Sequence, residues 1–513
     1  MNKTLLKGLS LQENSNFLEA KEIYSSFVNS ENKEERIFAL TNLANIFFIE
    51  KNYNQASRMY EYAIKIDPKN QKAYYNYGVL KLRLKEYEEA KKLFISSINL
   101  NRNHYSSNLN LAIVLKNLKE YDISKKYFDI VKNLKSKDMD YYYNIANLYL
   151  AMEKYFLALL NYKKSIKLNP QNPKAYYSIA LVFHKTHRDK TAINYFDKAI
   201  ELKNNYYDAL FAKGLSLLQL GDYQNGWELY KYRYEANNAL KRVDYKIPEY
   251  NGQDLKNKTI LVQGEQGFGD NIEFCRYLIY LKNAKKVYFA VREPLVKLMT
   301  CSFKNTNIKV VGDKDTLYNI DYYSSLLDLP RVYKNKDIFL DTKFPYLKYE
   351  KKEFDIQSLK NNKTKIGFVW KGNSEHKNDH NRSIDIKEFE TLFKITHIDF
   401  YSFQIDEKEA LDDYIHKYEN IYDLSTYIKD FNDTSNLLLK MDCLISIDSS
   451  MIHLAGALNI KSYLILPKFY EWRWQNNTNV SWYNNFFYEI QKKQKDWKLP
   501  INNIKNSLTN DYL

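Results

Sequence analysis

The sequence predicts an all-α superhelix of repeated helix pairs, followed by an α/β module of two domains that face a cleft. The first observation is a set of aromatic residues that stand 34 residues apart without a slip: Tyr60, Phe94, Phe128, Tyr162, Phe196 and Tyr230. The second is a change of pattern after residue 258, where short apolar runs alternate with helical stretches. The predicted boundaries are a repeat array over 1–236, a linker over 237–257, and α/β domains over 258–350 and 351–513.

Small residues keep the same step as the aromatic ones. They occupy two positions twelve residues apart, and the aromatic residue stands four beyond the second. This spacing is typical of two antiparallel helices that touch at the small residues and anchor on the ring. Asp67-Pro68 and Asn169-Pro170 are predicted turns, because proline cannot continue a helix. The small positions are Ala44, Gly78, Ala112, Ala146, Ala180 and Gly214, then Ala56, Ala90, Ser124, Ala158, Ala192 and Gly226, and a further unit with Gly8 and Tyr24 precedes them.

These units resemble the tetratricopeptide repeat. Two residues before the first small position stand four asparagines, Asn42, Asn76, Asn110 and Asn144. First helices line the concave side of such an array, so these side chains would form a ladder that pairs with the backbone of a bound peptide. The protein-glycosylating N-acetylglucosamine transferases, whose architecture is similar, carry such a ladder. The alternative is that the asparagines bond neighbouring repeats or reflect an asparagine-rich composition.

Composition narrows the partners and the location. The chain has 77 Lys and Arg against 62 Asp and Glu, a formal net charge of +15. The lysines are spread along the repeats and no RNA-recognition or helix-turn-helix signature is present, so no nucleic-acid partner is predicted. Without a secretory leader or a long apolar span, we expect a cytoplasmic protein with no transmembrane segment. The scattered Cys275, Cys301 and Cys443 support neither a disulfide framework nor a metal site.

Two sets of buried strands are predicted after the linker. They imply parallel sheets that bind ligands at the carboxyl ends of their strands, with the division between the sets near 344–362. The first set is Ile260–Val262, Val287–Val291 and Ile308–Val311, and the second is Lys365–Trp370, Ile398–Phe403, Ile421–Leu424, Cys443–Ile447 and Ser462–Leu466.

The segment Gly264-Glu265-Gln266-Gly267-Phe268-Gly269-Asp270 follows the first strand. Gly267 and Gly269 let the backbone approach a ligand closely, and Asp270 would stand at the start of a helix that begins near Asn271. The alternative is that Asp270 only caps this helix. The glycine spacing differs from the dinucleotide-binding pattern, although this turn and Glu293 keep a dinucleotide-dependent oxidoreductase as a further alternative.

Two more strand ends carry polar residues. Trp370-Lys371-Gly372-Asn373 is followed by Arg382 and suits an anion such as a diphosphate, although an ordinary solvated loop has the same composition. Asp448-Ser449-Ser450 opens a helix whose free N–H groups and dipole favour an anion, and His453 lies in its first turn. The alternative for His453 is a packing residue. Asp313 to Asp315 is an acidic triplet in a charged loop, and it is not interpreted as a metal site.

The three motifs together resemble the heptosyltransferase-like glycosyltransferases, over Leu255 to about Pro500. The resemblance is carried by Gln266 to Asp270, by Trp370 to Asn373 with Asn381 to Ser383, and by Asp448 to Leu458 followed by Glu471-Trp472-Arg473-Trp474. It implies a GT-B fold of two Rossmann-like domains and inverting transfer from a nucleotide-sugar donor, without a metal or other cofactor. Asp270 then matches the general base.

On the same resemblance, the donor would be held by Gly267, Gly269, Lys371, Asn373, Arg382, Asp448, Ser449, Ser450 and His453. Ser450 stands where that family has a glycine, which puts the close approach of the backbone in doubt. The family also lacks the repeats, and their presence favours a protein or peptide acceptor. The rival hypothesis is a repeat scaffold whose α/β module has lost catalysis.

Overall fold

The computed structural model describes residues 2–135, 138–236, 245–312, 315, 317, 319–334, 336, 338–376, 378–474 and 482–512. Its contacts divide the chain into two compact units. One comprises Met1–Val182 with Asn194–Asn204, and the other comprises Phe183–Ile193 with Asn205–Leu513.

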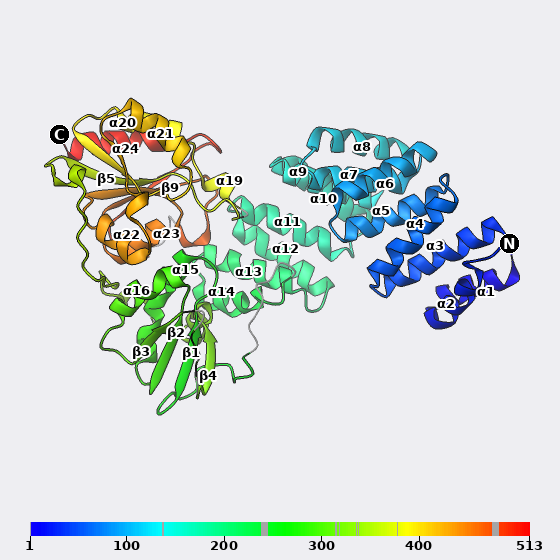
Figure 1. The fold of residues 1–513 in the computed structure, drawn as a ribbon, viewed down its shortest axis with the longest axis horizontal. Coiled ribbons are helices and arrows are strands. Elements are labelled where there is room, and N and C mark those ends of the chain that lie inside the picture. Colours follow the sequence, from blue (N-terminus) through cyan, green and yellow to red (C-terminus); the bar gives the residue numbers. More distant parts are fainter. Residues whose placement is uncertain are drawn as a thin grey trace. The chain divides into compact units, whose positions relative to one another are not determined.

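Antiparallel helix pairs fill the chain up to Tyr230, as predicted (Figure 1). They are α1 (Lys3–Glu13), α2 (Phe17–Phe27), α3 (Lys33–Ile49), α4 (Tyr53–Ile66), α5 (Gln71–Arg83), α6 (Tyr87–Leu100), α7 (Tyr105–Asn117), α8 (Tyr121–Leu134), α9 (Met139–Ala151), α10 (Tyr155–Leu168), α11 (Pro173–Lys185), α12 (Asp189–Leu202), α13 (Tyr207–Gln219) and α14 (Tyr223–Tyr230).

The 34-residue register is visible in the backbone as well as in the side chains. The aromatic anchors are all buried, from fully buried Phe94 to Tyr230 with 4% of its surface exposed. From the second pair on, one turn residue in each pair adopts a positive φ at the same step: Lys51, Lys85, Lys119, Glu153, His187 and Gly221. Only the last is a glycine, so the other turns hold an L-residue in the left-handed region.

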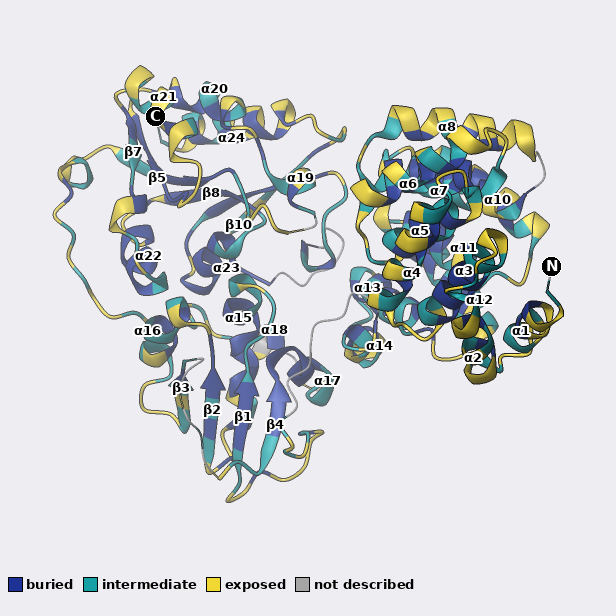
Figure 2. Cartoon of the chain, turned by 45° about the vertical axis from the view of Figure 1, so that its right-hand side comes forward, coloured by how far each residue is buried: buried dark blue, intermediate teal, exposed yellow. Residues whose placement is uncertain are grey.

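Two parallel sheets follow, and the predicted α/β class is confirmed. The first has the order β3-β2-β1-β4 and the second the order β10-β9-β8-β5-β6-β7. The strands are β1 (Thr259–Gln263), β2 (Lys286–Ala290), β3 (Ile308–Val311), β4 (Tyr322–Ser325), β5 (Thr364–Val369), β6 (Ile398–Ser402), β7 (Ile421–Asp423), β8 (Cys443–Ile447), β9 (Ser462–Leu466) and β10 (Phe486–Ile490). Figure 2 shows most of these strands in the buried class.

Helices follow most of these strands. They are α15 (Phe268–Phe274), α16 (Glu293–Ser302), α17 (Leu329–Val332), α18 (Ile338–Asp341), α19 (Asp379–Arg382), α20 (Glu390–Phe393), α21 (Lys408–Lys417), α22 (Phe431–Leu438), α23 (Ser450–Ala457) and α24 (Lys498–Asp511). Among the described residues, none of the helices combines the length and apolar character that a bilayer crossing needs.

Two details differ from the sequence-based expectations. Helix α15 begins at Phe268, before the expected Asn271, because the Asp270 carboxylate accepts a hydrogen bond from the Gly267 N–H and so caps a helix that already contains Gly269. Part of the predicted linker pairs with the first sheet, since the N–H of Tyr323 in β4 donates to the Pro248 carbonyl at 2.9 Å. Residues 237–244 of that linker lie outside the described residues.

The last helix pair packs into the core of the α/β part. Trp227 of α14 lies 5.5 Å from Phe274 of α15 and 5.4 Å from Trp472, measured between ring centroids. Trp227 and Tyr230 belong to the same apolar cluster as residues of both sheets. The final repeat is therefore part of the compact unit that carries the predicted site.

Candidate functional site

The loop between β1 and α15 is folded tightly by its own polar groups. The Gly264 N–H donates to the Ala290 carbonyl at 2.8 Å, and a Cβ on Gly264 would stand 2.0 Å from Asn271 Oδ1, so no side chain fits there. Gln266 has a φ of 59°. Asp270 Oδ2 accepts from the Gly267 N–H at 2.9 Å, which is the capping role given above as the alternative for Asp270.

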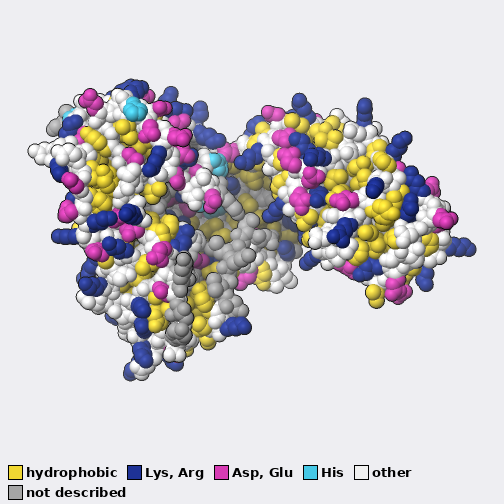
Figure 3. Space-filling view, in the orientation of Figure 1, with side chains coloured by type: hydrophobic (Ala, Val, Ile, Leu, Met, Phe, Trp, Pro, Cys, Tyr) yellow, Lys and Arg dark blue, Asp and Glu magenta, His cyan; other side chains and the backbone are white. Residues whose placement is uncertain are grey.

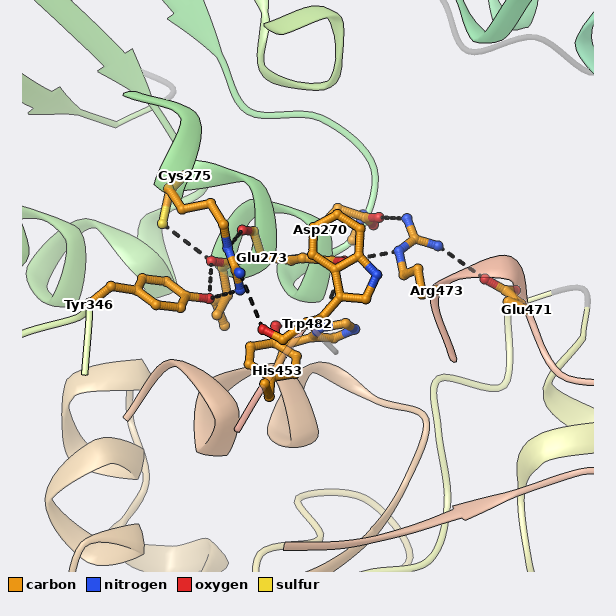
Figure 4. Close-up of polar contacts among 12 residues, drawn as sticks. Asp270, Glu273, Cys275, Tyr346, His453, Glu471, Arg473 and Trp482 are labelled. Carbon is orange, nitrogen blue, oxygen red and sulfur yellow. Dashed lines mark hydrogen bonds and ion pairs between the residues drawn. The ribbon is translucent and has the colours of Figure 1, made fainter. Parts of the chain in front are cut away.

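Arg473 binds the other oxygen of Asp270. Its Nη2 donates to Asp270 Oδ1, its Nε to Glu273 Oε2 at 2.9 Å, and its Nη1 to Glu471 Oε2 at 3.1 Å (Figure 4). Arg473 and Asp270 are 10% and 16% exposed at their side chains, and Glu273 is fully buried. One guanidinium therefore joins α15 to the segment that follows β9.

Burial raises the pKa values of these acids. The pKa of Glu273 rises to about 7, with Arg473 acting in the opposite direction. Burial also raises the pKa of Asp270, and both Arg473 and the Gly267 N–H oppose that shift. The ionised form of Asp270 is thus favoured mainly by Arg473 and also by the Gly267 N–H.

His453 lies at the contact between α15 and α23. It is 5% exposed, its ring stacks on Trp474 at 5.1 Å, and its Nδ1 lies 2.9 Å from the Tyr483 hydroxyl. A Cβ on Gly269 would stand 2.7 Å from His453 Cδ2, so this glycine allows the two helices to meet. Burial, then the charge of Arg473, lower the pKa of His453 well below its usual value, and the ring is neutral. These contacts are those of a packing residue. A role of His453 in binding the nucleotide-sugar donor stays a prediction.

Two of the predicted stretches meet at one edge of the second sheet. Arg382, at the end of α19, donates from Nη1 to the Asp448 carbonyl at 2.9 Å, although the two residues are 66 positions apart. Its Nε lies 3.3 Å from Asp379 Oδ1. Burial, then the charge of Glu471, raise the pKa of Asp448 to about 6. The parallel topology brings these residues together, as the sequence predicted.

The remaining predicted donor residues are engaged within the protein. Lys371 Nζ forms an ion pair with Glu407, and Asn373 Oδ1 accepts from the Glu375 N–H at 2.9 Å. Ser449 precedes α23, makes no side-chain capping hydrogen bond there, and places its Oγ 3.3 Å from Ser446 Oγ. Ser450 is the first residue of α23, with its Cα 3.5 Å from the position that a Cβ on Gly269 would take.

A second buried ion cluster lies behind the β1 loop. Arg233, from the turn after α14, is 2% exposed and binds Glu265 at 2.6 Å and Asp328 at 2.8 Å. The hydroxyls of Tyr234 and Ser325 also donate to Glu265. Sequence reasoning missed Arg233 and gave Arg473 no role of its own. The motif Glu471-Trp472-Arg473-Trp474 was the only available signal for the latter.

The asparagine ladder is engaged in part. Asn42 is 3% exposed and its Nδ2 donates to the Phe38 carbonyl of its own helix at 2.9 Å. Asn144 makes the same bond to Asp140, while Asn76 donates to Asn45 in the preceding unit at 3.0 Å. Asn110 Nδ2 lies 3.5 Å from the Tyr75 hydroxyl. Asn76 and Asn110 therefore make the bonds between neighbouring repeats that the alternative describes, although both remain partly exposed, as does Asn144. Asn42 alone is buried.

The face of the molecule that Figure 3 shows has no concentrated patch of one charge. On the face that Figure 3 shows, Lys and Arg side chains are scattered among acidic ones. In the described part of the chain, no group of three or more His, Cys, Asp or Glu residues is arranged to hold a metal ion. Asp313, in the acidic triplet that the sequence singled out, lies outside the described residues.

Comparisons with protein families identify the repeats. A TPR repeat model matches residues 146–186, and two tetratricopeptide repeat models match residues 47–107 and 173–206. The chain is 38% identical over 71 residues to Protein FlbA of Caulobacter vibrioides, a match that covers 13% of this chain and 12% of that protein. The N-terminal region is therefore an array of tetratricopeptide repeats, and the chain spans about an eighth of the curated relative that it matches.

Several solved structures have regions similar to part of this chain. One is a tetratricopeptide repeat protein from Parabacteroides merdae, with 17% identity, 45% of this chain and 90% of that chain covered, and a TM-score of 0.41. Another is PilW, a type IV pilus biogenesis factor, with 22% identity, 40% of this chain and 95% of that chain covered, and a TM-score of 0.37. A third is YrrB, a TPR protein described as having an unusual peptide-binding site, with 20% identity, 38% of this chain and 100% of that chain covered, and a TM-score of 0.31.

Proposed function

We propose that this chain is a glycosyltransferase whose repeats recruit a protein or peptide and whose GT-B module transfers a sugar to it. The donor would be a nucleotide sugar, and the transfer would be inverting and independent of a metal. The main support is the convergence of three strand ends. The residues that follow β1, β5 and β8 are linked by the Gly269 contact with His453 and by the hydrogen bond from Arg382 to Asp448.

The residues at these strand ends have the chemistry that transfer requires. Asp270 would take the proton of the acceptor hydroxyl as its oxygen attacks the anomeric carbon, and the bond to the nucleoside diphosphate would break. Arg382, Lys371 and the first turn of α23 would stabilise the growing negative charge of that leaving group. His453, with a neutral ring, would contribute as a hydrogen-bond donor without a charge.

The repeats supply the second half of the proposal. Stacked helix pairs create extended concave surfaces, and such surfaces bind polypeptides. The partly exposed amides of Asn76, Asn110 and Asn144 recur at one register along the array, which suits a partner in extended conformation. A protein or peptide acceptor follows from joining this array to the α/β module.

A non-catalytic scaffold is the second candidate. The ion pairs Asp270–Arg473 and Lys371–Glu407 favour it, because they occupy the very groups that catalysis would use. Ser450, in place of the glycine of the heptosyltransferase-like family, favours it too.

Release of nucleotide from a panel of nucleotide sugars separates the two candidates. An active transferase hydrolyses its donor slowly without an acceptor, and Asp270→Asn should reduce that turnover about a hundredfold or more while leaving donor binding intact. A panel in which no nucleotide sugar binds, measured by thermal shift, or in which the wild type and Asp270→Asn turn over at equal rates, contradicts the transferase.

A further inference from the structure

We propose that Arg473 is a positioning residue for this transfer. Arg473 follows a strand of the second sheet, and it orients the Asp270 carboxylate, which follows a strand of the first, and keeps it ionised. The inference rests on the proposed function, and it concerns a residue to which the resemblance assigns no role. Arg473 follows the strand β9 of the second sheet, whereas Asp270 follows β1 of the first.

The guanidinium is held in one orientation by its own contacts. Three of its nitrogens reach carboxylates of different residues, Asp270, Glu273 and Glu471. Because the guanidinium is planar and its N–H groups form a fixed fork, three such contacts leave it no rotation. Arg473 thereby orients Asp270 Oδ1, while the Gly267 N–H holds Oδ2 of the same carboxylate.

That backbone is anchored on several sides. Trp472 and Trp474 flank Arg473 and are 5% and 1% exposed. Two residues from other segments bind the chain just before it. The Asn381 amide donates to the Phe469 carbonyl at 3.3 Å, and the His187 Nε2 of a repeat turn lies 2.8 Å from the Tyr470 carbonyl. Arg473 is thus fixed by the second sheet and by the repeats before it reaches Asp270.

Among the groups around Asp270, Arg473 has the largest effect in favour of the ionised carboxylate. The other titratable groups that act on Asp270 or are acted on by it are Glu273, Glu471, Glu265, Tyr230 and His376. Burial, Glu471 and Glu265 raise the pKa of Asp270, whereas Arg473 and the Gly267 N–H lower it. Removal of Arg473 would leave a buried carboxylate among like charges, and a protonated carboxyl cannot act as a base.

The test is the pH dependence of nucleotide-sugar turnover in the full chain. Arg473→Gln should move the acidic limb of the kcat/KM profile to higher pH by about one to three units, the usual effect of an arginine on an adjacent carboxyl. Arg473→Lys keeps the charge without the fork, so its limb should stay near that of the wild type while kcat still falls. Nucleoside diphosphate affinity should change less than about threefold in both variants, since the ion pairs of Arg473 are with the acids of α15 and its own segment.

Two further variants keep the test decisive if Arg473→Gln does not fold. Glu471 is 36% exposed, and its negative charge raises the pKa of Asp270. Glu471→Gln removes that charge, so the acidic limb should move to lower pH. Arg292→Gln is the matched control, because Arg292 is an exposed arginine that binds the Gln266 carbonyl of the same loop, and its limb should not move.

The outcomes distinguish this inference from the function on which it rests. An active wild type whose limb is unchanged in Arg473→Gln and Glu471→Gln overturns the role of Arg473 alone. A tenfold loss of diphosphate affinity in Arg473→Lys would make Arg473 a ligand contact instead. A wild type without turnover of any nucleotide sugar overturns the transferase, and the positioning role with it.

Discussion

Arg233, in the turn after the last repeat helix, lies 2.6 Å from Glu265 in the loop that leads to Asp270. The same guanidinium binds Asp328 at 2.8 Å, and only 2% of the arginine is exposed. The neighbouring Gln266 amide donates to the Tyr230 hydroxyl of α14 at 2.8 Å. The final repeat and the turn after it therefore hold the β1 loop in place. Removing Arg233 would leave Glu265 and Asp328 without their cation.

We expect Arg233→Met to destabilise the second unit by about 3 to 5 kcal/mol, because the change leaves buried carboxylates without their cation. Urea unfolding, followed by the fluorescence of the tryptophans of this unit, measures the loss. Lys387→Met is the matched control, because Lys387 lies in the same unit and forms an exposed ion pair with Asp385, so its loss should be much smaller. Similar losses in the two variants would show that the Arg233 cluster does not secure the fold.

Two glycines should respond differently to alanine. A Cβ on Gly456 would stand 2.2 Å from Cδ1 of Tyr483, whose ring is 1% exposed and whose hydroxyl contacts His453. Gly456→Ala should therefore cost about 1 to 3 kcal/mol or more through overpacking. Thermal unfolding compares this variant with Gly78→Ala in the repeats.

Gly78→Ala should be close to neutral although its Cβ would approach Phe94 Cε1 to 2.7 Å. The same register holds Ala44 and Ala112, and the aromatic anchors of those repeats stay buried, so the ring can adjust. Alanine also favours a helix over glycine by about 1 kcal/mol, which offsets the strain. If Gly78→Ala lost as much stability as Gly456→Ala, glycine and alanine would not be interchangeable at this position of the repeat.

The four asparagines of the ladder should differ in their effect on peptide binding. Asn76, Asn110 and Asn144 changed together to Ala should weaken binding of extended peptides roughly tenfold or more, at about 0.5 to 1.5 kcal/mol per lost hydrogen bond. Asn42→Ala should leave affinity unchanged, because that amide is buried on the Phe38 carbonyl. Fluorescence polarisation with a randomised peptide library provides the measurement, after circular dichroism has confirmed the fold.

An unchanged affinity in the folded triple variant would make the ladder structural. Nucleotide binding by the second unit serves as the internal control, since the proposal gives these asparagines no part in it.

Local pattern was sufficient for much of the fold. The repeats were predictable because one helix pair places the same residue types at each step, and buried parallel strands were predictable from continuous apolar runs. Strand β4, with the sequence Tyr-Tyr-Ser-Ser, was missed because its hydroxyl residues do not form such a run. Edge strand β10 was missed because it is only partly buried.

The site was less predictable than the fold. Sequence order and parallel topology brought Arg382 to Asp448, since both follow strands of one sheet. The ion pair from Arg473 to Asp270 joins positions 203 apart that follow strands of two different sheets, and no local spacing encodes it. Arg233 stands in a three-residue helical turn just before the predicted linker, where nothing in the pattern indicated a buried charge.

Buried acids give the second unit a pH-dependent stability. The pKa of Glu273 is raised from 4.5 to about 7 by burial, so the folded state binds this proton more tightly than the unfolded chain. Its stabilising contribution is complete below about pH 4.5 and is lost as pH rises through 7. We expect the unfolding free energy to fall between pH 5 and about 7.5, and Glu273→Gln to flatten that fall. Urea titrations at several pH values check this, and equal slopes in the two proteins would rule it out.

The donor diphosphate should be anchored at the edge where Arg382 meets Asp448. Arg382→Ala should weaken nucleoside diphosphate binding by about 1.5 to 3 kcal/mol, the range for a hydrogen bond to a charged group, and nucleoside binding hardly at all. His453→Ala should act in the same direction but less, because the low pKa of the buried ring leaves it neutral near pH 7. Calorimetric titrations of both variants with a nucleoside and its diphosphate decide the matter. Equal losses for the two ligands, or none for either, would place the anion elsewhere and remove the basis for the transfer chemistry at Asp270.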